Sequence, residues 1–232
     1  GDNPEFDQLG EKLSDLGHPG VHLRVQNEYA LGWLIFLWEI AVAVVGKEIS
    51  IHPFNQPNVE SAKVLARESV AAYQKTGNLP KSMAQELSAD SLKKFLAKKQ
   101  AGDYISLQAY IQPTEGAAAA LKELQSVLRD QTRLAVTVGF GPRFLHSTGQ
   151  LHKGGKNNGL FVQFVSHPEI KVEIPEKAGE EDSFIDFGVL KQAQAIGDAK
   201  ALTQAGRRVI VFNVLPAPDE QFQQITVGIQ AQ

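Results

Sequence analysis

The segment Leu134-Ala-Val-Thr-Val138 gives the clearest indication of the fold. It is a short apolar run with two valines and a threonine, which is typical of a strand buried on both faces of a parallel sheet. A segment with helical periodicity precedes it at residues 114–131, and a glycine-rich loop follows it at residues 139–155. A helix, a buried strand and a loop in this order indicate an α/β fold with a mostly parallel sheet.

The same alternation of strands and helices continues on both sides of this segment. The predicted strands span residues 21–25, 103–111, 133–138, 160–165 and 208–214, with an edge strand at 225–229. The predicted helices span residues 27–47, 58–75, 81–100, 114–131 and 187–205. We expect the helix at 81–100 in two pieces, with Ser88 or Asp90 as an internal N-cap. These elements predict a mostly parallel sheet covered by helices on both faces.

Residues 29–45 are nearly all apolar and could be mistaken for a membrane span. The run is only about 17 residues long, at the short limit for crossing a bilayer. It also carries Glu39, and a carboxylate near the centre of a span is costly in lipid. We therefore predict a helix buried in a protein core, and no membrane contact.

The composition excludes several classes of function. The chain has 232 residues, a formal net charge of -3 and no cysteine, so disulfides, thiolate chemistry and cysteine-bound zinc are excluded. A slightly acidic chain lacks the basic footprint of a nucleic-acid-binding protein. Residues 1–20 are polar, without the apolar run of a signal peptide. We expect a linker or an added leader at 1–20, one domain at 21–232, a cytoplasmic location, and a chain that is part of a longer protein.

Ligands of parallel sheets bind beyond the carboxyl ends of the strands, in loops and at helix N-termini. One candidate is the loop 52–58, which leads into the helix that holds Lys63. Its exposed amides, the Gln56 side chain and the Lys63 ammonium suit a phosphate or a sugar hydroxyl. The alternative is a plain Asn58 cap followed by a surface lysine.

The loop 139–155 is a second candidate because it combines five glycines with His146, His152, Arg143 and Lys153. Glycines permit close backbone approach to a ligand, and a histidine can transfer protons near neutral pH. The two histidines could also bind a metal, but no carboxylate lies near them in sequence, and we predict no metal site. A third loop, 112–116, contains Thr114 in an ordinary helix start, with a phosphate site as the alternative.

Three blocks of the chain resemble the phosphoglucose isomerase family. The first runs from Leu31 to Lys63, where Phe54, Gln56, Val59, Glu60 and Lys63 occupy matching positions. The second is His146-Ser-Thr-Gly-Gln-Leu-His-Lys-Gly154, which is one residue shorter than the family's block. The third is the helical segment from Val189 to Leu202.

The resemblance is closest to the carboxyl-terminal isomerase part of bifunctional transaldolase/phosphoglucose isomerase proteins, over about residues 15–215. It implies a sugar isomerase (SIS) fold, a three-layer sandwich in which a five-stranded, mostly parallel sheet lies between helices. It also implies interconversion of glucose 6-phosphate and fructose 6-phosphate by ring opening and proton transfer through a cis-enediol, without a metal or redox cofactor. The implied partners are a transaldolase domain and a first SIS domain, both amino-terminal in the same protein, and the family allows a homodimer.

The resemblance also implies roles for individual residues. Lys63 would assist ring opening, Gln56 would contact the phosphate, and His152 would be the acid or base, with His146 as its competitor. The other substrate-binding candidates are Asn55, Arg143, Ser147, Thr148, Gln150, Lys153 and Thr114.

The family's proton-abstracting glutamate has no match in the chain. We therefore expect the base to come from an amino-terminal partner domain, and the chain alone to bind sugar phosphate but isomerise it poorly. The alternative is a sugar-phosphate-binding domain with a structural or regulatory role and no catalysis.

Overall fold

A computed structural model gives the structure of residues 3–55, 57–177, 179 and 183–231. The chain divides into two compact units, Gly1–Asn55 and Gln56–Gln232. The division falls after Asn55, whereas the sequence analysis placed the only boundary at residue 20. Gln56, a predicted phosphate contact, lies outside the described residues.

The first unit consists of two helices and their connection. Helix α1 spans Pro4–Asp15, and helix α2 spans Glu28–Glu48, where the side chain of Asn27 caps the helix by accepting a hydrogen bond from the Ala30 amide at 2.9 Å. The predicted strand at 21–25 is wrong, because these residues are part of the connection between the two helices and form no strand. A strand needs a neighbouring strand to pair its backbone N–H and C=O groups, and alternation in the sequence does not supply one.

Helix α2 confirms the predicted helix but not its burial within this unit. Gly46 is its only described buried residue, and it packs against Pro53. The apolar side chains cover all sides of α2, so a unit of two helices has no surface large enough to bury them. By length and composition α2 could also cross a membrane. Core helices and signal sequences often share these two properties, so they do not by themselves indicate a membrane.

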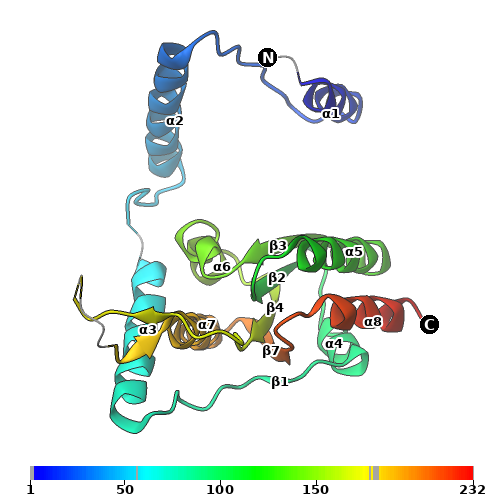
Figure 1. Cartoon of the computed structure of the whole chain (residues 1–232). Helices are drawn as coiled ribbons and strands as arrows, with labels where there is room; N and C mark the ends of the chain where they lie inside the picture. The colour runs from blue at the N-terminus through cyan, green and yellow to red at the C-terminus, as the bar shows by residue number, and fades with distance from the viewer. Residues whose placement is uncertain (1–2, 56, 178, 180–182, 232) are drawn as a thin grey trace. The chain divides into compact units, whose positions relative to one another are not determined.

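The second unit is built on a five-stranded parallel sheet, which confirms the predicted fold class (Figure 1). The strands follow the order β1-β7-β4-β2-β3. Their bounds are Gln85–Glu86 for β1, Tyr104–Tyr110 for β2, Ala135–Phe140 for β3, Gly159–Ser166 for β4 and Arg208–Val214 for β7. A small antiparallel pair, β5 at Glu173–Ile174 and β6 at Ile185–Asp186, precedes helix α7.

Helices cover both faces of this sheet, which makes three layers. Helices α4 (Ala89–Leu96), α5 (Glu115–Thr132) and α8 (Asp219–Gln230) share one apolar core with the sheet. Helix α7 (Phe187–Gln204) covers the other face. Alternation along β2 directs Ile105, Leu107 and Ala109 into the α5 side and Tyr110 into the α7 side. Gln108 therefore faces α7 as well.

Helix α3 (Pro57–Thr76) packs on α7 (Figure 1). The close approach occurs at Gly197, where an added Cβ would lie 2.9 Å from the carbonyl oxygen of Ala62 and the amide of Ala66. A larger residue at 197 would push α3 away from α7. This contact holds Ala62 and Ala66 of α3 against α7.

Three predicted elements of the second unit differ from the structure. Residues 81–88 are not helical and contain the edge strand β1, although Ser88 does cap α4 as predicted, at 3.2 Å from the Ser91 amide. The run at 134–138 forms the opposite edge strand, β3, so it is only partly buried. The predicted edge strand at 225–229 is part of α8. An apolar segment can predict a strand, but it does not show whether that strand lies at the centre or at the edge of the sheet.

The spacing of buried residues in α8 explains the last of these differences. Phe222, Ile225, Thr226 and Ile229 are buried, at intervals of three and four, whereas Val227 is 64% exposed. A strand would have put Ile225, Val227 and Ile229 on one face.

Substitutions in α8 therefore distinguish a helix from a strand. We expect Ile225→Ala to lower the free energy of unfolding by about 2–5 kcal/mol, because it leaves a cavity in the core. Val227→Ala should change it by less than about 0.5 kcal/mol. Chemical denaturation of both variants checks this, and equal losses at the two positions would contradict the helix.

Candidate functional site

The glycine-rich segment after β3 lies along the α7 face of the sheet, from the end of β2 at Tyr110 to its start at Tyr104. It forms a short 3-10 helix at Arg143–His146 and helix α6 at Gly149–Gly154. Gly141 makes this turn possible, since an added Cβ would lie 2.5 Å from the ring of Tyr110. Tyr110 is the last residue of β2, so the segment is held next to the central strands.

Helix α6 is fixed at both of its ends by long-range hydrogen bonds. The Gln150 side chain accepts from the Asn58 amide at 3.2 Å, which satisfies a free N–H at the start of α3. Arg207 donates to the carbonyl oxygens of Lys153 and Gly155 at the other end. These bonds hold α6 between α3 and the start of β7.

A pocket of about 420 Å³ lies between α3, α6 and α7. Its polar lining includes four cationic or titratable side chains, Lys63, Arg67, His146 and Lys153, and its walls are otherwise mostly apolar. The described residues that line it include no aspartate or glutamate. A concave site with this charge balance suits an anionic ligand.

The cationic side chains of the pocket differ in whether another side chain already pairs with them. Arg67 donates to Glu60 at 2.6 Å, and both side chains are exposed, so solvent weakens this pair. Lys63 is exposed and forms no hydrogen bond or ion pair with any residue that the structure describes. Lys63 is therefore the pocket cation that is most available to a ligand.

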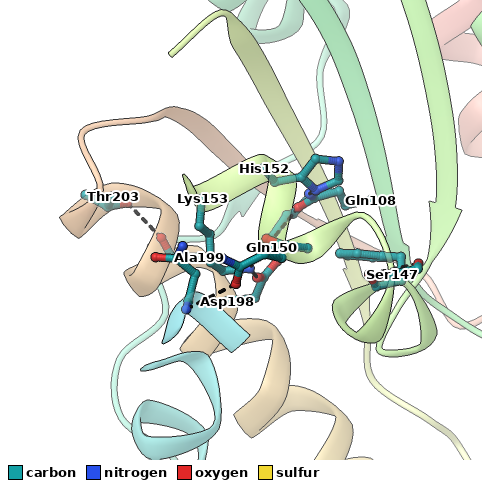
Figure 2. A network of polar contacts seen from close by, with 12 residues as sticks. Gln108, Ser147, Gln150, His152, Lys153, Asp198, Ala199 and Thr203 are labelled. Carbon is teal, nitrogen blue, oxygen red and sulfur yellow. Dashed lines mark hydrogen bonds and ion pairs between the residues drawn. The ribbon is translucent and has the colours of Figure 1, made fainter. Parts of the chain in front are cut away.

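Lys153 lies at the buried wall of the pocket, where its ammonium pairs with the carboxylate of Asp198 on α7 (Figure 2). The two side chains are 2% and 0% exposed. Lys153 also donates to the Gly149 carbonyl at 3.3 Å. Burial raises the pKa of Asp198, and the Lys153 charge opposes that shift. Such a pair is retained at a desolvation cost, which makes it a candidate functional group.

A chain of buried amides connects Asp198 to His152 (Figure 2). Gln163 donates its amide N–H bonds to Asp198 at 2.9 Å and to the Gln108 oxygen at 3.0 Å. Gln108 then presents its NH₂ group to Nδ1 of His152 at 3.1 Å. A carboxylate only accepts hydrogen bonds, so it sets the direction of the whole chain. Nδ1 is therefore an acceptor, and the ring proton lies on Nε2.

His152 lies in an aromatic enclosure rather than in the pocket. The rings of Tyr104, Phe144 and Phe161 have centroids 6.3, 6.1 and 5.2 Å from its own. Burial, and then the charge of Lys153, lower its pKa to about 4. His152 is consequently neutral at neutral pH and separated from the pocket, whereas His146 lines the pocket with Lys63.

The remaining candidates lie in varied positions. Thr114 caps α5 by accepting from the Ala117 amide at 3.1 Å, and Ser147 donates to the Phe144 carbonyl at 3.2 Å. Arg143 is exposed, with its guanidinium 6.0 Å from the Phe140 ring centroid. Thr148 is exposed and forms no cap, and Asn55 belongs to the first unit. The structure brings Lys63, His146 and Lys153 to one pocket.

The sequence analysis missed Arg67, Asp198, Gln163 and Gln108. Arg67 could have been found, because it lies four residues after Lys63 and so on the same face of a helix. Asp198 is a lone acid in an alanine-rich helical segment, which is also a usable signal. The two glutamines give no signal, since single glutamines in strands are common and only the fold brings them together.

The fold and the pocket define an α/β domain with a cationic pocket beside a five-stranded parallel sheet. No family model matches the chain. Over 43 residues it is 54% identical to the glucose-6-phosphate isomerases of Leuconostoc mesenteroides and Levilactobacillus brevis, and 46% identical to that of Limosilactobacillus reuteri. These matches cover 18% of this chain and 10% of each relative. The chain thus contains a short region similar to glucose-6-phosphate isomerase.

Among solved structures, a hypothetical protein from Thermus thermophilus aligns with 61% of this chain and 36% of its own. The TM-score is 0.48 and the sequence identity is 19%.

The environment of His152 predicts a pH effect on stability. Its pKa is lower in the folded chain, about 4, than the ordinary value near 6.5 in the unfolded chain. The unfolded chain therefore binds the proton first as the pH falls, and stability present above about pH 6.5 is lost toward pH 4. This histidine should contribute at most about 1.4 kcal/mol per pH unit to the slope.

NMR titration of the His152 ring checks the pKa, and denaturation at several pH values checks the slope. His152→Asn keeps a hydrogen-bond acceptor near the position of Nδ1 but removes the imidazole. The pH dependence of its stability should therefore lack the contribution of His152. A His152 titration midpoint near the ordinary value would contradict the buried neutral ring.

Proposed function

We propose that the chain carries the sugar-phosphate site of an isomerase that interconverts glucose 6-phosphate and fructose 6-phosphate. The observation that carries this proposal is that Lys63 and His146 line one pocket. They come from two sequence blocks that each resemble phosphoglucose isomerase, and they lie on different elements, α3 and the 3-10 helix after β3. The short region similar to glucose-6-phosphate isomerases supports the same reaction class.

The pocket offers the two kinds of group that sugar ring opening needs. A fixed cation can stabilise negative charge that develops on a sugar oxygen, and Lys63 is free to do so. An imidazole that reaches the ligand can transfer the proton, and His146 takes this role. His152, in contrast, is enclosed by aromatic rings and acts on the structure around the pocket.

Proton transfer between two carbons of the sugar requires a base. The described lining of the pocket contains no carboxylate, and the acid behind it, Asp198, already pairs with Lys153. We propose that the base comes from an SIS domain that is amino-terminal to this chain in the same protein. We also propose that this longer protein contains a transaldolase domain. The isolated chain then binds sugar phosphate without isomerising it.

A second candidate function is binding without catalysis, as a structural or regulatory domain. The lining of the pocket favours this function, because its described residues include cations and no carboxylate, and such a pocket can hold a sugar phosphate and leave it unchanged. Substitutions in the longer protein distinguish the two functions. Loss of turnover in Lys63→Ala and His146→Ala supports catalysis, and unchanged turnover in both supports binding alone.

Binding tests the pocket in the isolated chain. We expect Lys63→Met to weaken the binding of fructose 6-phosphate by about tenfold, because a charge-assisted hydrogen bond of about 1.5 kcal/mol is lost. Lys75→Met is the matched control, since it removes a lysine from the last turn of the same helix outside the pocket. Isothermal titration calorimetry measures both, and equal effects of the two substitutions would place the ligand elsewhere.

Turnover tests the missing base. We expect the isolated chain to show negligible formation of fructose 6-phosphate from glucose 6-phosphate in a coupled assay, because no carboxylate lines the described part of the pocket to transfer the proton between the two carbons. The longer protein with its amino-terminal domains should be active under the same conditions. Robust turnover by the isolated chain would refute the need for a partner domain.

A further inference from the structure

The buried wall of the pocket contains an ion pair, and burying its two charges costs desolvation free energy. Lys153 is 2% exposed and its partner Asp198 is fully buried, yet Lys153 lines the pocket. We propose that the Lys153 ammonium binds an anionic oxygen of the ligand at this wall, and that Asp198 is the residue that positions and charges it. This proposal rests on the proposed function for the class of ligand, a sugar phosphate.

Counting donors shows what the ammonium still lacks. A lysine ammonium has three N–H groups. One donates to the Gly149 carbonyl, and a second is taken up by the ion pair with Asp198, which Figure 2 shows. The third has no acceptor among the residues that the structure describes. Because Lys153 borders the pocket, this third N–H is the one left for a ligand oxygen.

The carboxylate of Asp198 is the counter-charge of this lysine. A buried ammonium without a counter-charge shifts its pKa down by several units. The pocket and α6 are otherwise surrounded by Lys63, Arg67, His146, His152 and Arg207. The carboxylate of Glu60 pairs with Arg67 at the exposed side of α3, where solvent screens it. Tyr110 lies beside Asp198, and burial and that carboxylate raise its pKa, so it stays neutral. Asp198 is thus the anion that balances Lys153.

Asp198 also determines the direction of the amide chain. As a carboxylate it can only accept from Gln163, which fixes Gln108 as the donor to Nδ1 of His152. An asparagine at position 198 could donate instead, and the chain could reverse. The proportion of the His152 Nε2–H tautomer therefore reports on Asp198 in a way that simple loss of packing would not.

The test is the binding of fructose 6-phosphate to Asp198→Asn at two pH values, about 7.5 and 8.5, both above the second pKa of the phosphate near 6. In this variant the ammonium loses its counter-charge, so the ligand must bring a proton to it. We expect wild-type affinity to change less than about twofold between the two pH values. The affinity of the variant for the ligand should fall by up to about tenfold between the two pH values. The variant should also take up a proton when it binds the ligand, which is measured as calorimetric heats that depend on the buffer.

Two further variants isolate the effect. Lys153→Met should weaken binding by about tenfold at both pH values, without proton uptake. Lys200→Met is the matched control, because it removes a lysine from the same helix as Asp198 but outside this pocket, and it should bind like wild type. If Asp198→Asn does not fold, the double variant Lys153→Met/Asp198→Asn removes both charges and should fold and bind like Lys153→Met.

The outcomes separate this proposal from the proposed function. Wild-type affinity in Lys153→Met, or pH-independent wild-type affinity in Asp198→Asn, would overturn the role of the pair and leave the sugar-phosphate site intact. No binding of fructose 6-phosphate by the wild-type chain would overturn the proposed function, and this proposal with it. In the wild type, the ¹⁵N resonance of the Lys153 ammonium should shift when the ligand is added.

Discussion

The buried carboxylate of Asp198 is the constraint on which this part of the molecule depends. A charge with no exposed surface must be paired and hydrogen-bonded, and Lys153 and Gln163 supply those contacts from α6 and β4. The carboxylate therefore ties the segment after β3 to the sheet and to α7. The adjacent Gly197 lets α3 pack closely on α7. The pocket forms where these elements meet, so its shape and its charge come from the same few contacts.

This arrangement separates the two histidines of the glycine-rich segment by function. The amide chain that begins at Asp198 ends at His152, holds its ring in one tautomer and keeps it among aromatic side chains. His146 lies in the 3-10 helix before α6 and lines the pocket together with the lysines. The site thus combines an available cation, Lys63, with a fixed one, Lys153. A ligand that carries both a phosphate and hydroxyl oxygens can use the two at once.

Much of the fold could be predicted from local patterns, and the failures have specific causes. The strands at 104–110, 159–166 and 208–214 were recognisable because their sequences are apolar over several residues, as burial within the sheet requires. Residues 225–229 were predicted as a strand because Ile225 and Ile229 fit a strand and a helix equally well. The packing of these residues in the core with Phe222 is what selects the helix. Of the candidate site, Lys63, His146 and Lys153 could be named in advance. Arg67 and Asp198 left signals in the sequence, whereas Gln108 and Gln163 come together only through the pairing of β2 with β4.

The sequence by itself determined the fold class, most of the elements on both sides of the sheet and the set of chemically able side chains, because periodicity and residue type are local properties. Only the tertiary structure decided which of these side chains share a pocket. Lys63 and His146 lie together because α3 packs on α7 next to the 3-10 helix, and His152 lies apart because α6 places it among the aromatic rings of Tyr104, Phe144 and Phe161. The tertiary structure also decided the charge balance of the pocket wall. Lys153 and Asp198 are far apart in the chain, and they pair because the fold buries both side chains together.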